Sequence, residues 1–184
     1  YPLMQNLDVR ALEADIAYGG VDQRGIYMLG REILPDHGWK SPVCIFAPLL
    51  SGLSGGKMSA SEETSKINLT DDTDAVVEKI QGAYCPAGEV EDNGVLEYLD
   101  HLVFPVLDER GESFHVERPA EYGGDLVYET YGALEEDYVE GELHPADLKP
   151  AAGHAISEVI APVRERLEAD TSLLAEAYPE TYGE

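Results

Sequence analysis

The sequence predicts an α/β segment with a parallel sheet, followed by a mostly α-helical domain. A short apolar run over 42–47 is bounded by prolines, and a Gly-rich loop follows it directly. Such a run is typical of a buried strand in a parallel sheet, and open α/β sheets bind ligands where their strands end. Beyond residue 66, apolar residues recur mainly at helical spacing. We therefore expect the carboxyl-terminal part of a Rossmann-like nucleotide-binding domain over 1–66 and a mainly helical domain over 67–184.

Two helices are expected before the strand. Apolar spacing over 9–16 predicts a helix that the pair Gly19-Gly20 ends. The same spacing over 26–33 predicts a second helix, which Pro35 closes.

Four helices and one hairpin are expected beyond the loop. The helices are predicted from apolar spacing and capping residues: one capped within 71–74, one over 96–103, one capped by Thr130, and a long one from Pro145 with an apolar stripe to Leu167 and a kink at Pro162. Residues 113–128 are expected to form a short extended or hairpin element around Gly123-Gly124. Residues 170–184 are expected to be loosely held.

The charge balance is strongly acidic. The chain has 43% hydrophobic residues, so a sizeable core is expected, but 37 Asp and Glu against 12 Lys and Arg give a net charge of −25. This composition favours a folded protein with a Lys-poor surface, as in halophilic cells. At molar salt the Debye length is about 3 Å, which screens the self-repulsion of the surface. A nucleic-acid partner would then have to be recognised by stacking and hydrogen bonds rather than by phosphate contacts.

The remaining composition indicates a cytoplasmic protein without a membrane partner. Cys44 and Cys85 lack partners at the spacing of metal ligands, which favours two buried, reduced thiols. No apolar run approaches the length of a membrane span, and no signal peptide is expected. The chain opens on Tyr1 without Met, which suggests a fragment.

The loop over 52–61 is suited to bind a polyphosphate. Three glycines allow the backbone to approach a ligand, and Lys57 is followed by the hydroxyl groups of Ser59 and Ser61. On the loop alone, a solvent-exposed Gly/Ser segment is an equally good interpretation.

A polar helix face could bind a small polar ligand. Tyr1, Gln5 and Asp8 follow the spacing i, i+4, i+7, and Gln23 follows the glycine pair 19–20. On spacing alone, ordinary solvated residues are the better interpretation.

Two later positions could recognise an unpaired base. Tyr122 stands beside two glycines and could stack on a base. Asp147 lies near a helix start, three residues after His144, and could accept hydrogen bonds from guanine. The alternatives are a half-buried Tyr and a carboxylate that complements the helix dipole.

The order of these motifs resembles that of the archaeal-type tyrosyl-tRNA synthetases, which are class I enzymes. The motifs are YPLMQ with Asp8, GGVDQR over 19–24, GLSGGKMSAS over 52–61, AYCPAG over 83–88, RP with YGGD over 118–125, and LHPADLK over 143–149. The resemblance covers residues 1 to about 168, which correspond to the C-terminal half or so of that family.

The resemblance implies a role for each candidate residue. A tyrosine pocket would be lined by Tyr1, Gln5, Asp8 and Gln23, and Asp8 would accept a hydrogen bond from the substrate phenol. ATP would be bound by the loop residues Lys57, Met58, Ser59, Ala60 and Ser61, of which Lys57, Ser59 and Ser61 would be catalytic. The tRNA would be contacted by Arg24, Tyr122, His144 and Asp147. Tyr122 would stack on the first anticodon base and Asp147 would bind that guanine. Mg²⁺ would accompany ATP, and no prosthetic group is expected. The full-length family members form homodimers.

Two departures limit what this chain could do alone. Ala60 stands where the KMSKS signature of the class has its second Lys, and the HIGH motif of the family is absent from the sequence. We therefore expect a tyrosine–tRNA ligase portion that is inactive by itself. A tryptophanyl-tRNA synthetase fragment, a non-catalytic tRNA-binding module and an acidic interaction domain are the alternatives.

Overall fold

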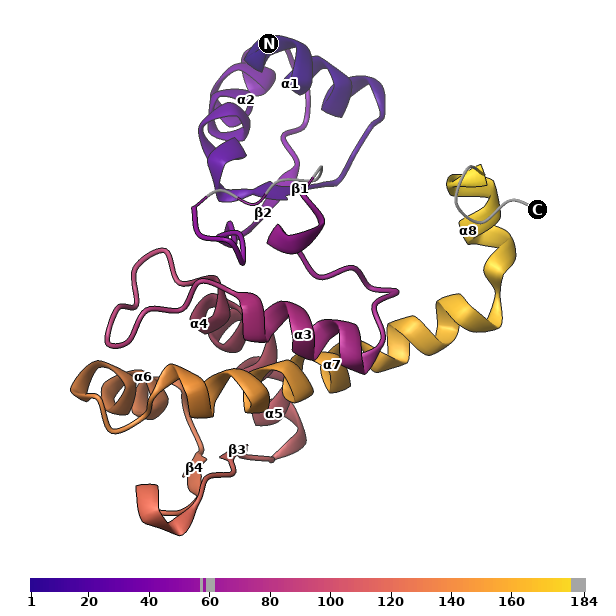
Figure 1. Cartoon of the computed structure of the whole chain (residues 1–184). Helices are drawn as coiled ribbons and strands as arrows, with labels where there is room; N and C mark the ends of the chain where they lie inside the picture. The colour runs from indigo at the N-terminus through magenta and orange to yellow at the C-terminus, as the bar shows by residue number, and fades with distance from the viewer. Residues whose placement is uncertain (57, 59–61, 180–184) are drawn as a thin grey trace. The chain divides into compact units, whose positions relative to one another are not determined.

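The computed structural model describes residues 1–56, 58 and 62–179, apart from the side chains of Glu63 and Leu173. The chain divides into two compact units, Tyr1–Leu49 and Leu50–Glu184, which are described separately (Figure 1). The boundary predicted between residues 66 and 67 separates a nucleotide-binding domain from a helical domain by function, and it stays a prediction.

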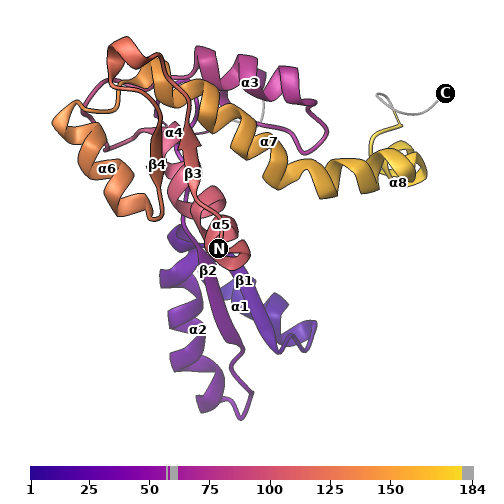
Figure 2. The same cartoon turned by 90° about the horizontal axis from the view of Figure 1, so that it is seen from below.

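The first unit is a small α/β unit. Its elements are α1 (Pro2–Ala11), β1 (Ile16–Gly20), a 3-10 turn (Val21–Gln23), α2 (Arg24–Asp36) and β2 (Val43–Ala47). The two strands are parallel, with Ile16 opposite Val43 and Gly20 opposite Ala47. Helix α2 runs beside the strands (Figure 2), and its Tyr27 ring lies 6.1 Å from that of Phe46. The predicted parallel sheet and the second helix are confirmed.

The helix predicted over 9–16 is wrong. Helix α1 ends at Ala11, Glu13 takes a left-handed φ of 51°, and Ile16 begins a strand. In that strand Ala17 is buried while Ile16 and Tyr18 on either side are exposed. Three apolar residues at i, i+3 and i+7 fit a helix, but they cannot exclude a helix that stops and a strand that begins between them.

One face of the small sheet has no cover within this unit. Two pairs of apolar residues lie opposite each other on this face, Ile16 with Val43 and Tyr18 with Ile45. Their exposed fractions are between 48% and 69%. Parallel sheets are normally covered on both faces, and two strands alone are marginally stable. This unit therefore has the surface of an incomplete sheet.

The second unit is mainly helical. Its helices are α3 (Thr73–Gly82), α4 (Gly94–Tyr98), α5 (Phe104–Arg110), α6 (Tyr131–Glu140), α7 (Pro145–Ala169) and α8 (Thr171–Ala177), and a π turn (Leu99–Val103) joins α4 to α5. Short 3-10 turns cover Glu63–Ser65 and Ala120–Tyr122. Strands β3 (Phe114–Val116) and β4 (Leu126–Tyr128) form the expected antiparallel hairpin. The four predicted helices are confirmed, and α8 shows that part of 170–184 is helical.

Capping residues define where these helices begin. Asp72 accepts a hydrogen bond from the Ala75 N–H at the start of α3, and Thr130 accepts one from the Ala133 N–H at the start of α6. Both are the predicted N-cap interactions. The π turn ends at Val103, and the N–H of Phe104 that follows it donates to the Leu99 carbonyl, five residues back. Pro105, the next residue, has no N–H and lies in the first turn of α5.

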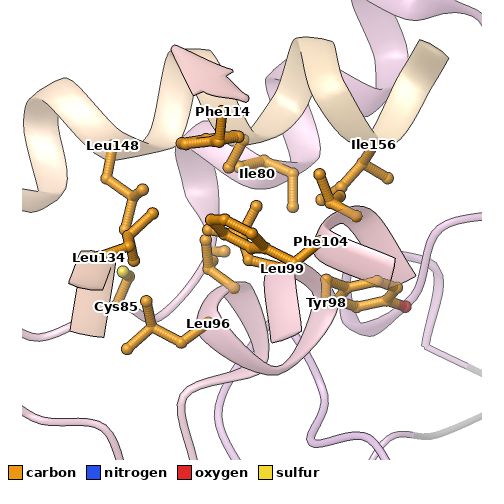
Figure 3. Close-up of a cluster of buried hydrophobic side chains, with 14 of the residues drawn as sticks. Ile80, Cys85, Leu96, Tyr98, Leu99, Phe104, Phe114, Leu134, Leu148 and Ile156 are labelled. Carbon is orange, nitrogen blue, oxygen red and sulfur yellow. The ribbon is translucent and has the colours of Figure 1, made fainter. Parts of the chain in front are cut away.

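The core of the second unit is formed by helices α3 to α7 and the hairpin (Figure 3). Leu148, Ala152 and Ile156 of the predicted α7 stripe are fully buried. Helix α7 reaches Ala169, as the stripe predicts, but the stripe is not buried along its whole length, because Val163 is 43% exposed. The stripe loses its partner there, since the buried part of α7 is the part that packs against α3 and the core.

Helices α3 and α7 lie side by side (Figure 1) because Gly153 of α7 lets them approach. A Cβ atom at Gly153 would lie 3.0 Å from the Val77 Cα and 3.1 Å from its Cγ2. The backbone atom cannot turn away as a flexible side-chain end can, so the two helices would have to separate.

Gly153→Ala is therefore expected to destabilise the second unit by about 1–3 kcal/mol, less the gain in helix propensity of about 1 kcal/mol. Gly132→Ala in α6 is the matched control, since a Cβ there meets nothing within 4 Å. Chemical denaturation should show Gly153→Ala less stable and Gly132→Ala unchanged or more stable. Equal midpoints would contradict this account of the α3–α7 contact.

Buried tyrosines add polar contacts to the core. The Tyr138 hydroxyl donates to the Pro86 carbonyl at 2.6 Å and lies 3.2 Å from the Cys85 Sγ, and the Asn93 Nδ2 donates to that hydroxyl at 3.4 Å. Burial raises the pKa of Tyr138, as it does for Tyr98 and Tyr128. These hydroxyls stay protonated in the folded chain above the pH at which free tyrosine ionises.

Stability should consequently fall at alkaline pH. In the unfolded chain each tyrosine loses its proton near pH 10, so its contribution is complete below that pH and is lost as the pH rises towards the raised folded-state pKa. The slope is about 1.4 kcal/mol per pH unit for each such tyrosine. Denaturation midpoints should drop from pH 10 to 11, and Tyr138→Phe should make the drop shallower. A midpoint that stays constant over this range would exclude the linkage.

Candidate functional site

The polar face predicted near the start of the chain lies on α1. Because α1 covers Pro2–Ala11 with Tyr1 as its N-cap, Tyr1, Gln5 and Asp8 fall on one helix face. Tyr1 is 82% exposed and Asp8 is exposed, whereas Gln5 is half-buried. The Gln5 Oε1 is buried without a hydrogen-bond partner in the described part of the chain. A buried acceptor of this kind favours a ligand that brings a donor.

Asn6 holds this helix on α2. Its Nδ2 donates to the carbonyls of Pro2 and Ile26, both at 2.9 Å, and the side chain is 2% exposed. A Cβ at Gly30 would lie 1.9 Å from the Asn6 Oδ1, so only glycine fits there. Sequence reasoning missed Asn6, because its partner Ile26 lies in a second helix and no local pattern signals the pairing.

Gln23 and Arg24 lie where the 3-10 turn meets α2. The Gln23 Nε2 donates to the Asp22 Oδ2 at 2.7 Å, and Arg24 is exposed. No hydrogen bond within the described residues joins Gln23 to Tyr1, Gln5 or Asp8. The residues of the predicted pocket thus come from two segments of this unit, α1 and the 3-10 turn before α2.

The base of the Gly-rich loop is a compact turn in the second unit. The Gly52 N–H donates to the Gly56 carbonyl at 2.7 Å, and the Gly55 N–H donates to the Gly52 carbonyl at 2.9 Å. Gly55 and Gly56 take left-handed φ values of 87° and 74°, which glycine adopts without strain. Met58 is half-buried against the core. Lys57, Ser59, Ala60 and Ser61 lie outside the described residues, so their phosphate-binding role stays a prediction.

Hydrogen bonds anchor this turn to the helical core. The Ser51 N–H and Oγ donate to the two carboxylate oxygens of Glu97 on α4, at 2.5 and 2.8 Å. The Leu53 N–H donates to the Ser65 carbonyl, and the Tyr84 N–H donates to the Leu53 carbonyl. Glu97 is a second residue that the sequence did not reveal, since its partner is 46 positions away. The loop base is thus held by the unit that carries the predicted anticodon residues.

Tyr122 lies on the turn between β3 and β4. It ends the 3-10 turn Ala120–Tyr122 and is 64% exposed. Gly123 and Gly124 follow with φ values of 99° and 79°, which explains the glycine pair. The exposed ring is available for stacking, and the half-buried alternative is wrong.

His144 and Asp147 lie at the start of α7. The His144 Nδ1 accepts a hydrogen bond from the Ala146 N–H, which makes His144 the N-cap, and Asp147 lies in the first turn. Asp147 lines a cavity of 710 Å³ between α7 and the segment around β3. His144 lines a neighbouring cavity of 410 Å³ with Lys149. No hydrogen bond in the described structure links Tyr122 to either residue.

The larger cavity is acidic. Its lining includes Glu112, Glu117, Asp147 and Glu158, with His115 and His154 beside them. Such a surface repels phosphates but can accept hydrogen bonds from the donor edge of a base. It favours base recognition over backbone binding, as expected for a protein of this charge.

The structure also describes the surroundings of the two cysteines. Both cysteines are free thiols, but only Cys85 is buried; Cys44 is half-buried on the two-stranded sheet, so its predicted burial is wrong. No three His, Cys, Asp or Glu side chains in the described ranges form a group that could hold a metal ion. None of the described helices combines the length and hydropathy needed to cross a bilayer.

Comparison with known proteins adds a family match. A family model described as tRNA synthetases class I (W and Y) matches residues 1–161. A tyrosine–tRNA ligase of Haloarcula marismortui is 77% identical over 183 residues, which is 100% of this chain and 53% of that protein. The chain thus spans about half the length of this curated relative.

Solved structures agree with the fold. A tyrosyl-tRNA synthetase from Archaeoglobus fulgidus, complexed with L-tyrosine, is 44% identical with a TM-score of 0.79, covering 91% of this chain and 51% of that one. The tyrosyl-tRNA synthetase from Pyrococcus horikoshii, also complexed with L-tyrosine, is 30% identical with a TM-score of 0.81 and covers 100% of this chain and 54% of that one. The predicted class, a Rossmann-like α/β part followed by a helical part, is confirmed.

Proposed function

Because this chain belongs to the class I tRNA synthetases of the tryptophan and tyrosine type, we propose that it is part of a tyrosine–tRNA ligase. Such an enzyme uses ATP to activate tyrosine and then transfers the amino acid to its tRNA. The observation that carries the proposal is the 77% identity to a tyrosine–tRNA ligase along the whole chain. The family model covers tryptophan and tyrosine enzymes alike, so this identity is what favours tyrosine over a tryptophanyl-tRNA synthetase.

The tyrosine pocket would include Tyr1, Gln5, Asp8 and Gln23. The unpaired Gln5 Oε1 supports this, because the substrate ammonium could supply its missing donor. Asp8 would accept the phenolic hydroxyl, and phenylalanine would leave this acceptor unpaired. Tyrosyl-tRNA synthetases are themselves the established example of such discrimination.

ATP would be bound by the loop that holds Lys57, Ser59 and Ser61. The anchored turn over 51–56 supports this, since it fixes where the loop leaves the core. Mg²⁺ is proposed only as the ion that accompanies ATP. The described residues offer it no group of three ligands.

The tRNA would contact this chain at two places. Arg24, exposed at the start of α2, would lie near the acceptor end. Tyr122 would stack on the first anticodon base, and Asp147, with His144 nearby, would bind that guanine. The exposed ring and the acidic cavity support this assignment. The full-length protein would be a cytoplasmic homodimer.

The uncovered sheet face argues that the first unit needs a further part to function. Ile16, Tyr18, Val43 and Ile45 would be covered by sequence that the relatives have and this chain does not include. A non-catalytic tRNA-binding module is the second candidate, because the chain spans 53% of its relative. A pure binding module would not need Lys57.

An exchange assay separates these two candidates. The chain alone should show no tyrosine-dependent ATP–pyrophosphate exchange. Joined in order to the part of the Haloarcula marismortui ligase that it does not match, it should restore exchange with tyrosine and not with tryptophan. Exchange by the isolated chain would contradict the proposed division of roles, and a folded but inactive joined protein would favour the binding module.

A further inference from the structure

The proposed anticodon site is assembled from two segments that need a connection. Tyr122 lies on the turn between β3 and β4, whereas His144 and Asp147 lie at the start of α7. In the part of the chain that the structure describes, no hydrogen bond joins Tyr122 to either of them. The hairpin packs against α7 in the common core, and a hydrogen-bonded link between the two segments would further fix the stacking ring relative to the carboxylate.

Arg118 makes the hydrogen bonds that connect these segments. Its Nε donates to the Gly124 carbonyl at 2.6 Å, inside the Tyr122 turn. Its Nη1 donates to the Glu142 carbonyl at 2.8 Å, two residues before His144. Its backbone N–H donates to the Asp125 Oδ1 at 3.0 Å, which closes the turn from the other side.

The turn is shaped around this guanidinium. Gly123 takes a φ of 99°, and a Cβ there would lie 3.1 Å from the Arg118 Nη2. A side chain at this position would therefore be strained and would crowd the guanidinium. Arg118 is half-buried, so its donors are partly shielded from water.

We propose that Arg118 is a positioning residue that holds the Tyr122 turn beside the start of α7, so that the Tyr122 ring and the Asp147 carboxylate address the same base. This inference rests on the proposed function and names the residue on which selectivity at that site depends. Arg118 itself need not touch the tRNA.

The chemistry of the contacts suits a protein of high salt. The Arg118 side chain donates to two backbone carbonyls, which carry no charge. These hydrogen bonds therefore do not depend on an ion pair that molar salt would screen. A guanidinium presents separate donors in a rigid plane and can serve two carbonyls at once, whereas the lysine ammonium is a point charge on a flexible stem. A lysine at position 118 should therefore keep the positive charge but not the two hydrogen bonds that link the Tyr122 turn to the start of α7.

The test measures selectivity rather than affinity alone. Binding of the 184-residue chain to tyrosine tRNA is measured in molar KCl, beside the same tRNA with its first anticodon base changed from G. In Arg118→Ala and Arg118→Lys, each shown to be folded at the assay temperature, the preference for G should fall about tenfold or more. Arg164→Ala is the matched control, since Arg164 likewise donates to a carbonyl, that of Asp71, in the same unit; it should keep the preference.

Each outcome is decisive. If the unsubstituted, folded chain does not prefer G, the proposed function fails and this inference fails with it. If that chain prefers G and folded Arg118→Lys prefers it equally, the inference is overturned while the proposed function stands. Should Arg118→Ala fail to fold, Arg118→Lys decides, because it keeps the charge and the aliphatic stem.

Discussion

Replacing Lys57 by Ala in the complete enzyme is expected to slow tyrosine activation about 10²–10³-fold, the usual cost of removing one group that stabilises charge in a transition state. The complete enzyme here is this chain joined to the unmatched part of the Haloarcula marismortui ligase. Lys57 is the cation on the loop, and Ala60 replaces the second Lys of the class signature. Stabilisation of the negative charge that develops as pyrophosphate leaves would therefore depend on Lys57. Pre-steady-state formation of tyrosyl-adenylate measures the effect.

Lys40→Ala is the control for the loss of a positive charge. Lys40 pairs with Asp15 on the surface, where both side chains are about 80% exposed, and such pairs contribute little, least of all in salt. Its variant should activate tyrosine at the unsubstituted rate. If Lys57→Ala slows tyrosine activation no more than Lys40→Ala does, the loop has no role in the activation step.

Asp147→Ala is expected to reduce the preference for G at the first anticodon position about 5- to 150-fold, which corresponds to about 1–3 kcal/mol for a paired base contact. The carboxylate can accept from both donors on the edge of guanine, and alanine can accept from neither. Asp147 opens into the acidic cavity at the start of α7. Competition binding with the two tRNAs measures the ratio directly.

Asp147 also complements the dipole of α7, so its loss would lower stability whatever its role in binding. Asp74→Ala controls for this, because Asp74 occupies the first turn of α3 in the same way. The two variants should lose similar stability, and only Asp147→Ala should lose selectivity. If both variants select G equally well, Asp147 stabilises the helix and does not recognise the base.

The sequence predicted the elements that local signals define. The proline-bounded strand β2 and the caps Asp72 and Thr130 involve residues close together in the chain, and the structure confirms them. Strand β1 was missed, because its alternation extends over only five residues and its apolar residues also fit a helix. Distinguishing the two required β2 as the pairing partner, which is a long-range contact.

The candidate residues could be named from ordered motifs, but the residues that position them could not. Asn6 reaches Ile26, Glu97 reaches Ser51 and Arg118 reaches Glu142. Each pairing joins separate elements, and nothing in the local sequence around the Asn, Glu or Arg signals it. The contacts that hold these segments in place are therefore visible only in the folded chain.

The most direct test of the account is the binding of the unsubstituted chain to tyrosine tRNA in molar KCl, compared with the same tRNA carrying another first anticodon base. We expect a clear preference for G, because recognition would rest on stacking by Tyr122 and hydrogen bonding by Asp147 rather than on phosphate contacts. Equal binding to both tRNAs, or no binding by a chain shown to be folded, would contradict it.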